Sequence, residues 1–170
     1  MKKKVLMIIS SADFRDEEYR EPKAILEKNG FRVVTACSSL SPARGMLGMV
    51  VRPDITLEQV EVSDYRAILF IGGSGSKEYW DNKTAHLIAR DAVSQDLLLG
   101  AICLAPVTLA RAGLLSDKRV TVFPSSGEEL VNRNAFYTRA RVETDGKIVT
   151  ADGPASSSAF GKQILKLLQE

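Results

Sequence analysis

Cys103 is the residue of this sequence best placed to act as a nucleophile. The apolar run 97–102 leads into it, and a helix-like pattern with Pro106 in its first turn begins directly afterwards. This pattern predicts a buried strand, a sharp turn that carries the thiol, and a helix. Amide N–H groups at a helix start favour negative charge, and the thiolate is the reactive form of cysteine. We therefore expect a thiol that ionises readily, with a small buried core residue as the alternative.

Two other segments carry groups that could assist such a thiol. Asp16, Glu17 and Glu18 open a helical pattern, where a carboxylate could move protons or merely suit the helix dipole. Gly72 and Gly73 follow the apolar run 67–71. Their missing side chains could form a tight turn or let backbone N–H groups reach a substrate oxygen.

The elements that must position these groups follow from the alternation of apolar runs and helical patterns. The segments predicted as strands are 4–9, 31–36, 67–71, 98–102, 120–123, 140–143 and 147–150, with a short strand or hairpin piece at 46–51. The predicted helices are 18–29, which stops at Gly30, then 84–96, the one after Cys103, and 156–168. Asp145 and Gly146 indicate a hairpin between the last two strands.

Continuous apolar strands separated by helices imply a mostly parallel sheet covered on both faces. Ligands in such sheets bind outside the carboxyl ends of the strands. Those ends carry residues 10–13, the two glycines and Cys103. We therefore expect three chemically useful loops to converge on one edge of the sheet.

Composition limits the classes of protein that this chain can belong to. Its 170 residues suit one domain, and 45% hydrophobic with 26% charged residues is ordinary for a soluble protein. The net charge of +2 gives no support for binding nucleic acid or an anionic membrane. The apolar run after Lys4 is short and is followed by polar residues, so we expect no signal peptide, and no segment approaches the roughly 20 apolar residues of a membrane span. Two distant cysteines make no disulfide framework, so we expect a cytoplasmic protein with free thiols.

Four segments, taken together, resemble the ThiJ/PfpI superfamily, which includes PfpI-type intracellular proteases and the human parkinsonism-associated branch. They are 14–19 (FRDEEY), 70–75 (FIGGSG), 101–106 (AICLAP) and 151–165 (ADGPASSSAFGKQIL). The resemblance covers nearly the whole chain and implies a single ThiJ/PfpI-like domain over residues 1–170. It also implies an α/β fold, the flavodoxin-like three-layer α/β/α sandwich with a mostly parallel sheet.

The resemblance assigns roles to particular residues. It implies that Cys103 is the nucleophile and that Glu18 faces it and transfers protons. It further implies an oxyanion or substrate-binding site formed by Gly72, Gly73 and Leu104. Burial beside a thiolate would raise the pKa of Glu18. No metal or other cofactor is implied.

Some positions depart from the superfamily's pattern. Leu104 and Phe123 stand where relatives carry histidine, and the single histidine, His86, lies in the amphipathic segment 84–96 and is interpreted as a packing or surface residue. A cysteine–histidine pair is therefore hard to build, which counts against a peptidase. Asp152 stands where one branch tends to carry arginine, so anion binding at that position is not expected.

The resemblance implies a cysteine-dependent enzyme of glyoxalase or deglycase type. Its partners would be a small-molecule carbonyl substrate and further copies of itself, in a homodimer or larger homo-oligomer. A cysteine-based redox sensor or chaperone of the oxidative stress response is the alternative, and an intracellular peptidase is less favoured. Cys37 is interpreted as a strand-end packing residue, with a resolving thiol as the minority hypothesis. Tyr79 and Trp80 could line the pocket, pack internally or contact a second subunit.

Overall fold

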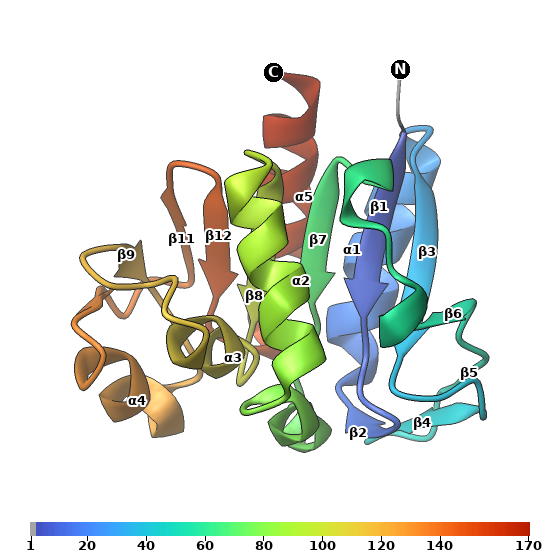
Figure 1. Cartoon of the computed structure of the whole chain (residues 1–170), viewed down its shortest axis with the longest axis horizontal. Coiled ribbons are helices and arrows are strands. Elements are labelled where there is room, and N and C mark those ends of the chain that lie inside the picture. Colours follow the sequence, from blue (N-terminus) through green and yellow to red (C-terminus); the bar gives the residue numbers. More distant parts are fainter. Residues whose placement is uncertain (1–2) are drawn as a thin grey trace.

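The apolar strands pair into a seven-stranded sheet in the computed structural model, which describes residues 3–170 (Figure 1). In spatial order the strands are β11 (Val142–Asp145), β12 (Ile148–Ala151), β8 (Leu98–Ile102), β7 (Ala67–Phe70), β1 (Lys4–Ile8), β3 (Arg32–Cys37) and β6 (Ile55–Thr56). All neighbours pair in parallel except β11 and β12. These two form the antiparallel hairpin expected at Asp145 and Gly146.

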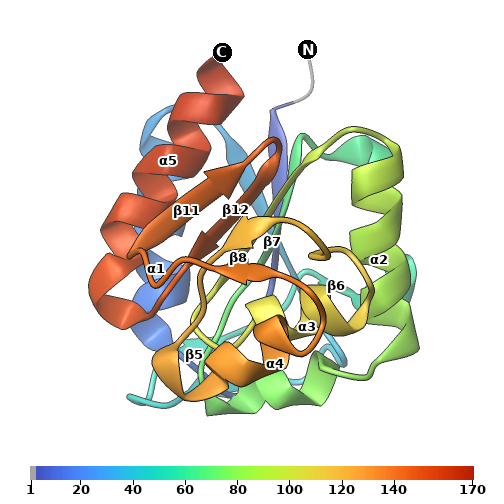
Figure 2. The same ribbon diagram turned by 90° about the vertical axis from the view of Figure 1, so that its left-hand side faces the viewer.

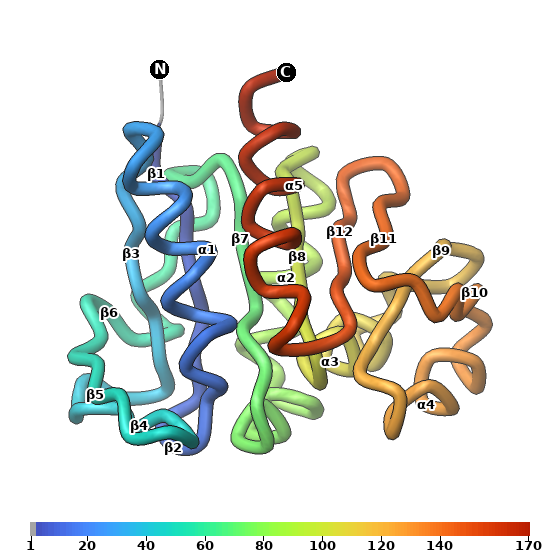
Figure 3. The backbone as a smooth tube through the Cα atoms, turned by 180° about the vertical axis from the view of Figure 1, so that it is seen from behind, coloured from blue at the N-terminus to red at the C-terminus, as the bar shows by residue number. Residues whose placement is uncertain are grey.

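Helices cover both faces of this sheet. Helices α1 (Asp16–Lys28) and α5 (Ser157–Gln169) pack together on one face, while α2 (Lys83–Ser94) and the short α3 (Pro106–Arg111) lie on the other. Figure 2 shows the sheet edge-on between the two layers, and Figure 3 shows α1 and α5 from their own side. The arrangement confirms the predicted α/β fold with a mostly parallel sheet.

The side chains of strand β1 pack on both faces of the sheet, because successive side chains of a strand point to opposite sides. Val5 and Met7 belong to a buried cluster that includes Phe160 of α5. Leu6 and Ile8 belong to a second cluster, which contains the buried face of α2. Burial on both sides explains why the sequence of this strand is a continuous apolar run at 5–9.

Smaller elements surround the carboxyl edge of the sheet and its β11 end. Three short strands form a second sheet: β2 (Ala12–Phe14), β4 (Ala43–Gly45) and β5 (Val50–Val51). Strands β9 (Arg119–Val120) and β10 (Phe136–Tyr137) pair near α4 (Gly127–Val131). Single turns of 3-10 helix are η1 (Leu57–Gln59), η2 (Val62–Asp64), η4 (Pro124–Ser126) and η5 (Pro154–Ser156), and a longer one is η3 (Ser74–Tyr79).

Several predicted bounds differ from the observed ones. Helix α1 begins at Asp16, two residues before the predicted start. The segment 46–51 is mostly the turn of the β4–β5 hairpin, with Gly48 at a φ of 97°. The predicted strand 140–143 is observed at Val142–Asp145, the residues that pair with β12 from Ala151 to Ile148. Among residues 3–170, no helix has the length and apolar character needed to cross a membrane.

Candidate active site

The expected convergence of loops occurs at the carboxyl ends of β1, β7 and β8, which are neighbours in the sheet. Strand β7 ends at Phe70 and leads into Gly72 and Gly73, and β8 ends directly before Cys103. The first turn of α1 brings Glu18 to the same place. A Cβ atom added to Gly72 would lie 2.6 Å from both the Cys103 Cβ and the Glu18 Oε1. The thiol and the carboxyl therefore flank a glycine that leaves room for both.

Cys103 occupies a left-handed backbone conformation, with φ at 66°. This conformation costs an L-residue roughly 1–2 kcal/mol, so the surroundings must hold it. The Cys103 N–H donates to the Ala151 carbonyl, and the Cys103 carbonyl accepts from the Phe123 N–H, both at 2.8 Å. The residue is only 6% exposed. The thiol thus sits in a fixed turn between β8 and α3, nearly closed to solvent.

Glu18 is fully buried on the inward side of α1. Neither of its carboxyl oxygens has a hydrogen-bond partner within the part of the chain that the structure describes. Buried polar atoms are nearly always paired, and an unpaired one calls for an explanation. A carboxyl left open beside a thiol is suited to exchange protons with a third molecule at the sulfur.

Burial raises the pKa of Glu18 to about 8, although the Cys103 thiol, the Arg15 guanidinium and the Gly72 backbone N–H favour the charged form. The sequence-based expectation of a raised pKa agrees with this direction. Burial, followed by the Glu18 carboxylate, also raises the pKa of the Cys103 thiol, to about 12. At neutral pH the resting pair is therefore a thiol beside a carboxylic acid.

The expectation of a readily ionised thiol is wrong in this geometry. Helix α3 has only six residues and begins at Pro106, three residues beyond the sulfur, so its dipole gives little help. The backbone N–H groups of Gly73 and Leu104 do favour the thiolate and lower the pKa of Cys103. Burial raises this pKa by more than the two N–H groups lower it.

Gly73 and Leu104 nevertheless present two N–H groups toward the sulfur. Neither N–H donates to another backbone carbonyl among residues 3–170. Gly73 has a φ of 98°, and a Cβ there would lie 2.5 Å from the Asp13 carbonyl oxygen. The Arg15 N–H donates to the Gly72 carbonyl at 2.9 Å and ties the glycine loop to the start of α1. The structure thus brings together all five predicted site residues, with two backbone N–H groups at the sulfur, where an oxyanion could form.

Other residues considered from the sequence lie elsewhere or have other contacts. His86 Nε2 lies 2.7 Å from the Trp80 carbonyl oxygen, so this ring is engaged outside the pair. Asp152 accepts a hydrogen bond from the Ser156 hydroxyl at 2.6 Å. Cys37 is buried at the end of β3, with its sulfur 3.8 Å from the Tyr79 hydroxyl. Phe123 is 39% exposed, and its backbone N–H donates to the Cys103 carbonyl.

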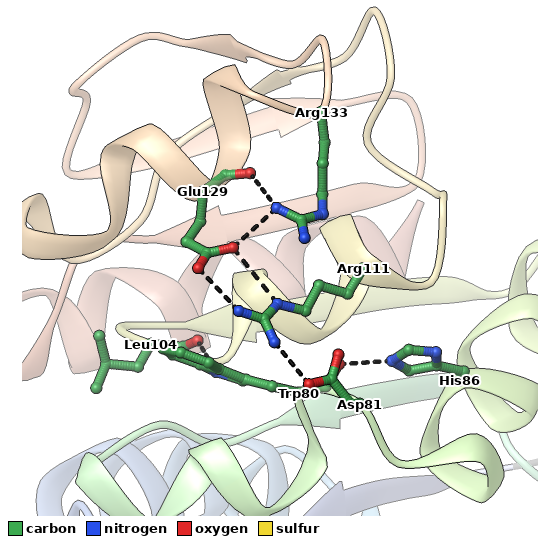
Figure 4. A network of polar contacts seen from close by, with 7 residues as sticks. All are labelled: Trp80, Asp81, His86, Leu104, Arg111, Glu129 and Arg133. Carbon is green, nitrogen blue, oxygen red and sulfur yellow. Dashed lines mark hydrogen bonds and ion pairs between the residues drawn. The ribbon is translucent and has the colours of Figure 1, made fainter.

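Arg15 has no role in the sequence-based prediction, and for Trp80 the prediction left open pocket lining, internal packing or a subunit contact. Arg15 extends its charge toward both Glu18 and Cys103 while its guanidinium binds Glu17 at 2.8 and 3.1 Å. The indole Nε1 of Trp80 donates to the Leu104 carbonyl at 3.0 Å (Figure 4). Trp80 follows the glycine loop in the sequence, which is the signal that pointed to it. Its contact with Leu104, however, spans 24 residues and is a product of the fold.

Two negative observations describe the surroundings of the pair. In the described region, no group of three His, Cys, Asp or Glu side chains is arranged to hold a metal ion. A cavity of about 760 Å³ lies at the opposite, amino-terminal edge of the sheet, with Tyr65, Leu98 and Lys147 in its wall. None of the five predicted site residues borders that cavity.

Comparison with known proteins places this geometry in a family context. The sequence model of the DJ-1/PfpI family matches residues 3–167. An uncharacterized protein of Methanocaldococcus jannaschii is 40% identical over 98% of this chain and 83% of its own length. A Pyrococcus abyssi protein named a deglycase is 27% identical over 96% of this chain and 99% of its own length.

The solved structure of a ThiJ/PfpI domain protein from Brachyspira murdochii matches with a TM-score of 0.97 at 28% identity. The match covers 99% of this chain and 97% of that one.

Proposed function

Because this chain belongs to the DJ-1/PfpI family, we propose that it is a cysteine-dependent enzyme of glyoxalase or deglycase type. Its substrate would be a small molecule with a reactive carbonyl. The observation that carries the proposal is the Glu18 carboxyl, which is buried beside the Cys103 thiol and whose oxygens have no hydrogen-bond partner among residues 3–170. The similarity to a relative named a deglycase supports the same class of chemistry.

Each group has a distinct role in this proposal. With a 2-oxoaldehyde such as methylglyoxal, the Cys103 sulfur bonds to the aldehyde carbon, and the carbonyl electron pair moves to oxygen. The thiol proton passes to one Glu18 oxygen while the protonated Glu18 oxygen gives its proton to the new alkoxide. The Gly73 and Leu104 N–H groups stabilise the developing negative charge. A carboxyl that is neutral at pH 7 can both give and accept protons in this step.

The adduct then rearranges without an external oxidant. Protonated Glu18 gives its proton to the neighbouring ketone oxygen and takes the C–H proton of the former aldehyde, which forms an enediol. Glu18 then gives that proton to the former ketone carbon and takes the hydroxyl proton next to the sulfur, which leaves a thioester of a 2-hydroxy acid. Water cleaves the thioester, releases the hydroxy acid and returns the proton to the Cys103 sulfur. The net change is the addition of one water to the 2-oxoaldehyde.

The loss of methylglyoxal with time, catalysed by the purified protein, tests this proposal. The Cys103→Ser variant should reduce the loss to the uncatalysed rate, because serine is a far weaker nucleophile here. Cys37→Ser is the matched control and should retain the wild-type rate, since Cys37 is buried at the end of β3, which β1 separates from β7 and β8 in the sheet. Equal rates for wild type and Cys103→Ser would refute the role of the cysteine. An inactive wild type would refute this reaction.

A redox sensor or chaperone is the second candidate, and the same carboxyl favours it. A sulfinate formed by oxidation of Cys103 could accept a hydrogen bond from protonated Glu18. Mass spectrometry after mild peroxide treatment separates the two candidates: oxidation no greater at Cys103 than at Cys37 counts against a sensor. A peptidase is less favoured, because the single histidine of the chain is engaged with the Trp80 carbonyl.

We further propose that the chain acts as one ThiJ/PfpI-like domain in the cytoplasm and as a homodimer or larger homo-oligomer. The extent of the family match, over residues 3–167, supports one domain. Both cysteines are free thiols, as a reducing compartment would keep them. Four exposed apolar side chains gather in residues 40–50 and support self-association, namely Leu40, Met46, Leu47 and Val50.

A further inference from the structure

The Leu104 N–H can serve as a donor only if the turn after Cys103 is held in place. The Phe123 N–H donates to the Cys103 carbonyl and fixes the peptide group that Cys103 shares with Leu104. In a trans peptide the N–H points away from the carbonyl, so this bond directs the Leu104 N–H to the other side. That side holds the sulfur, on which this N–H acts.

The next peptide group is held by Trp80. Its indole N–H donates to the Leu104 carbonyl at 3.0 Å, and the Val107 N–H reaches the same oxygen at 3.3 Å. The two bonds, from Phe123 and Trp80, thus fix the carbonyls on either side of Leu104. The indole is the only side chain among residues 3–170 that donates to the turn 103–105.

Both the ring and the backbone carbonyl of Trp80 contact neighbouring side chains (Figure 4). The Arg111 guanidinium carbon lies 4.9 Å from the centre of its ring, a cation–π arrangement. Ion pairs of 2.7 Å to Asp81 and 2.8 Å to Glu129 fix that guanidinium. His86 Nε2 lies 2.7 Å from the Trp80 carbonyl oxygen. The ring and the backbone carbonyl of Trp80 are therefore both held, which keeps its indole N–H at the Leu104 carbonyl.

We infer that Trp80 is a positioning residue, which acts through the Leu104 carbonyl to keep the Leu104 N–H aimed at the reacting centre. The inference rests on the proposed carbonyl chemistry of Cys103 for its kinetic consequence. Its structural consequence, a fixed turn next to the thiol, does not depend on which reaction Cys103 performs.

The decisive variant is Trp80→Phe, which removes the indole N–H and keeps an aromatic ring under Arg111. All proteins carry Cys37→Ser, so that iodoacetamide modifies Cys103 alone. The matched control is Arg90→Met, which removes another partly buried side-chain bond to a backbone carbonyl, from Arg90 Nε to Ala112 at 2.9 Å, at the far end of α3. The readouts are the alkylation rate at one fixed pH, and kcat and KM for methylglyoxal.

Removing one oxyanion donor costs about 10²- to 10³-fold in kcat, so loosening its support should cost about tenfold. We expect Trp80→Phe to lower kcat and the alkylation rate by about tenfold. KM should change by less than about twofold, because ground-state binding is untouched. Arg90→Met should match the Cys37→Ser background in all three quantities.

Wild-type alkylation and kcat in Trp80→Phe would overturn the inference, and so would equal losses in Trp80→Phe and Arg90→Met. If Trp80→Phe does not fold, Arg111→Met leaves the indole N–H in place and removes the nearer of the two cations on its ring, while Lys77 Nζ stays 5.5 Å from the ring centre. It should show a smaller loss of the same kind, and wild-type values in it would overturn the inference. If the wild type does not consume methylglyoxal, the proposed function fails, while the alkylation rates still decide the role of Trp80.

Discussion

Glu17 and Glu18 are adjacent in α1 but have opposite electrostatic environments. The Glu17 carboxylate accepts two bonds from Arg15, which lower its pKa. Glu18 has no such partner among the described residues, and burial raises its pKa to about 8. Environments that push the pKa values of neighbouring carboxyls apart assign them different roles. Only Glu18 can hold a proton at neutral pH and present it to a substrate.

This difference predicts how stability depends on pH. Between about pH 4.5 and 8 the folded protein keeps the Glu18 proton that the unfolded chain has lost. The folded state therefore binds more protons, and the unfolding free energy falls as pH rises through this window. Glu18→Gln avoids this loss, so the variant should exceed the wild type in stability at pH 8 by at most about 5 kcal/mol. Urea unfolding at several pH values measures the difference.

Glu17→Gln is the control for that experiment, and its expected change in unfolding free energy has the opposite sign. It should lose up to about 1 kcal/mol of stability at neutral pH. The deficit should shrink as pH falls through the lowered pKa of Glu17, where the wild-type carboxylate also becomes neutral. A Glu18→Gln variant that is less stable than the wild type at pH 8 would mean that Glu18 is charged in the folded protein.

At the scale of elements, the loop after β7 controls how closely α1 and β8 approach each other. A Cβ at Gly72 would lie 2.5 Å from the Ile102 carbonyl oxygen and 2.6 Å from both Glu18 Oε1 and the Cys103 Cβ. Gly72→Ala must push these groups apart. We expect a loss of about 1–3 kcal/mol in stability and a fall of about 10²-fold in kcat for methylglyoxal.

Gly113→Ala separates crowding from the general effect of replacing a glycine. Gly113 has a φ of 82° but no atom within 4 Å of the added Cβ. The substitution should cost about 1 kcal/mol of stability from backbone strain and leave kcat unchanged. If Gly72→Ala and Gly113→Ala changed kcat equally, close packing at Gly72 would have no part in catalysis.

The elements that the sequence specifies well are those with their own apolar pattern. Strand β8 has the predicted bounds 98–102, and β1 and β7 differ from prediction by one residue. The two- and three-residue strands β2, β6 and β10 were not predicted, because contacts with distant segments define them. The start of the short helix α3 also cannot be predicted from the sequence. Its six residues are too few for the pattern after Cys103 to fix its start.

The candidate site likewise contains residues that the sequence pattern identifies and one that it does not. Cys103 and the two glycines follow from strand ends, but the choice of Glu18 over Asp16 rests on the family resemblance. In the structure the Asp16 carboxylate has a separate role, because it accepts the N–H groups of Leu47 at 3.0 Å and Met49 at 2.9 Å. The surroundings of each carboxyl, which separate Asp16 from Glu18, depend on the packing of α1 and cannot be read from residue type.

At the scale of the whole molecule, the apolar side chains of residues 40–50 predict self-association. Leu47 is 63% exposed at the turn between β4 and β5. We expect light scattering to give a mass of at least twice the 18.6 kDa of one chain. Leu47→Glu should shift the protein toward the monomer, because burying an unpaired charge in an apolar contact is unfavourable.

Leu87→Glu is the matched control for self-association. Leu87 is 57% exposed on α2, which covers the other face of the sheet from α1. The Leu87→Glu variant should have the same light-scattering mass as the wild type. A monomeric wild type, or equal dissociation by both variants, would contradict a contact through residues 40–50.

The proposed cooperation of Cys103 and Glu18 is tested most directly by the methylglyoxal turnover of Glu18→Gln, with Glu17→Gln assayed beside it. Glutamine has nearly the same size but cannot exchange a proton. We predict that kcat falls by about 10²- to 10⁴-fold in Glu18→Gln and by less than about twofold in Glu17→Gln, while both variants remain folded. A folded Glu18→Gln variant that turns over methylglyoxal at the wild-type rate would contradict the account.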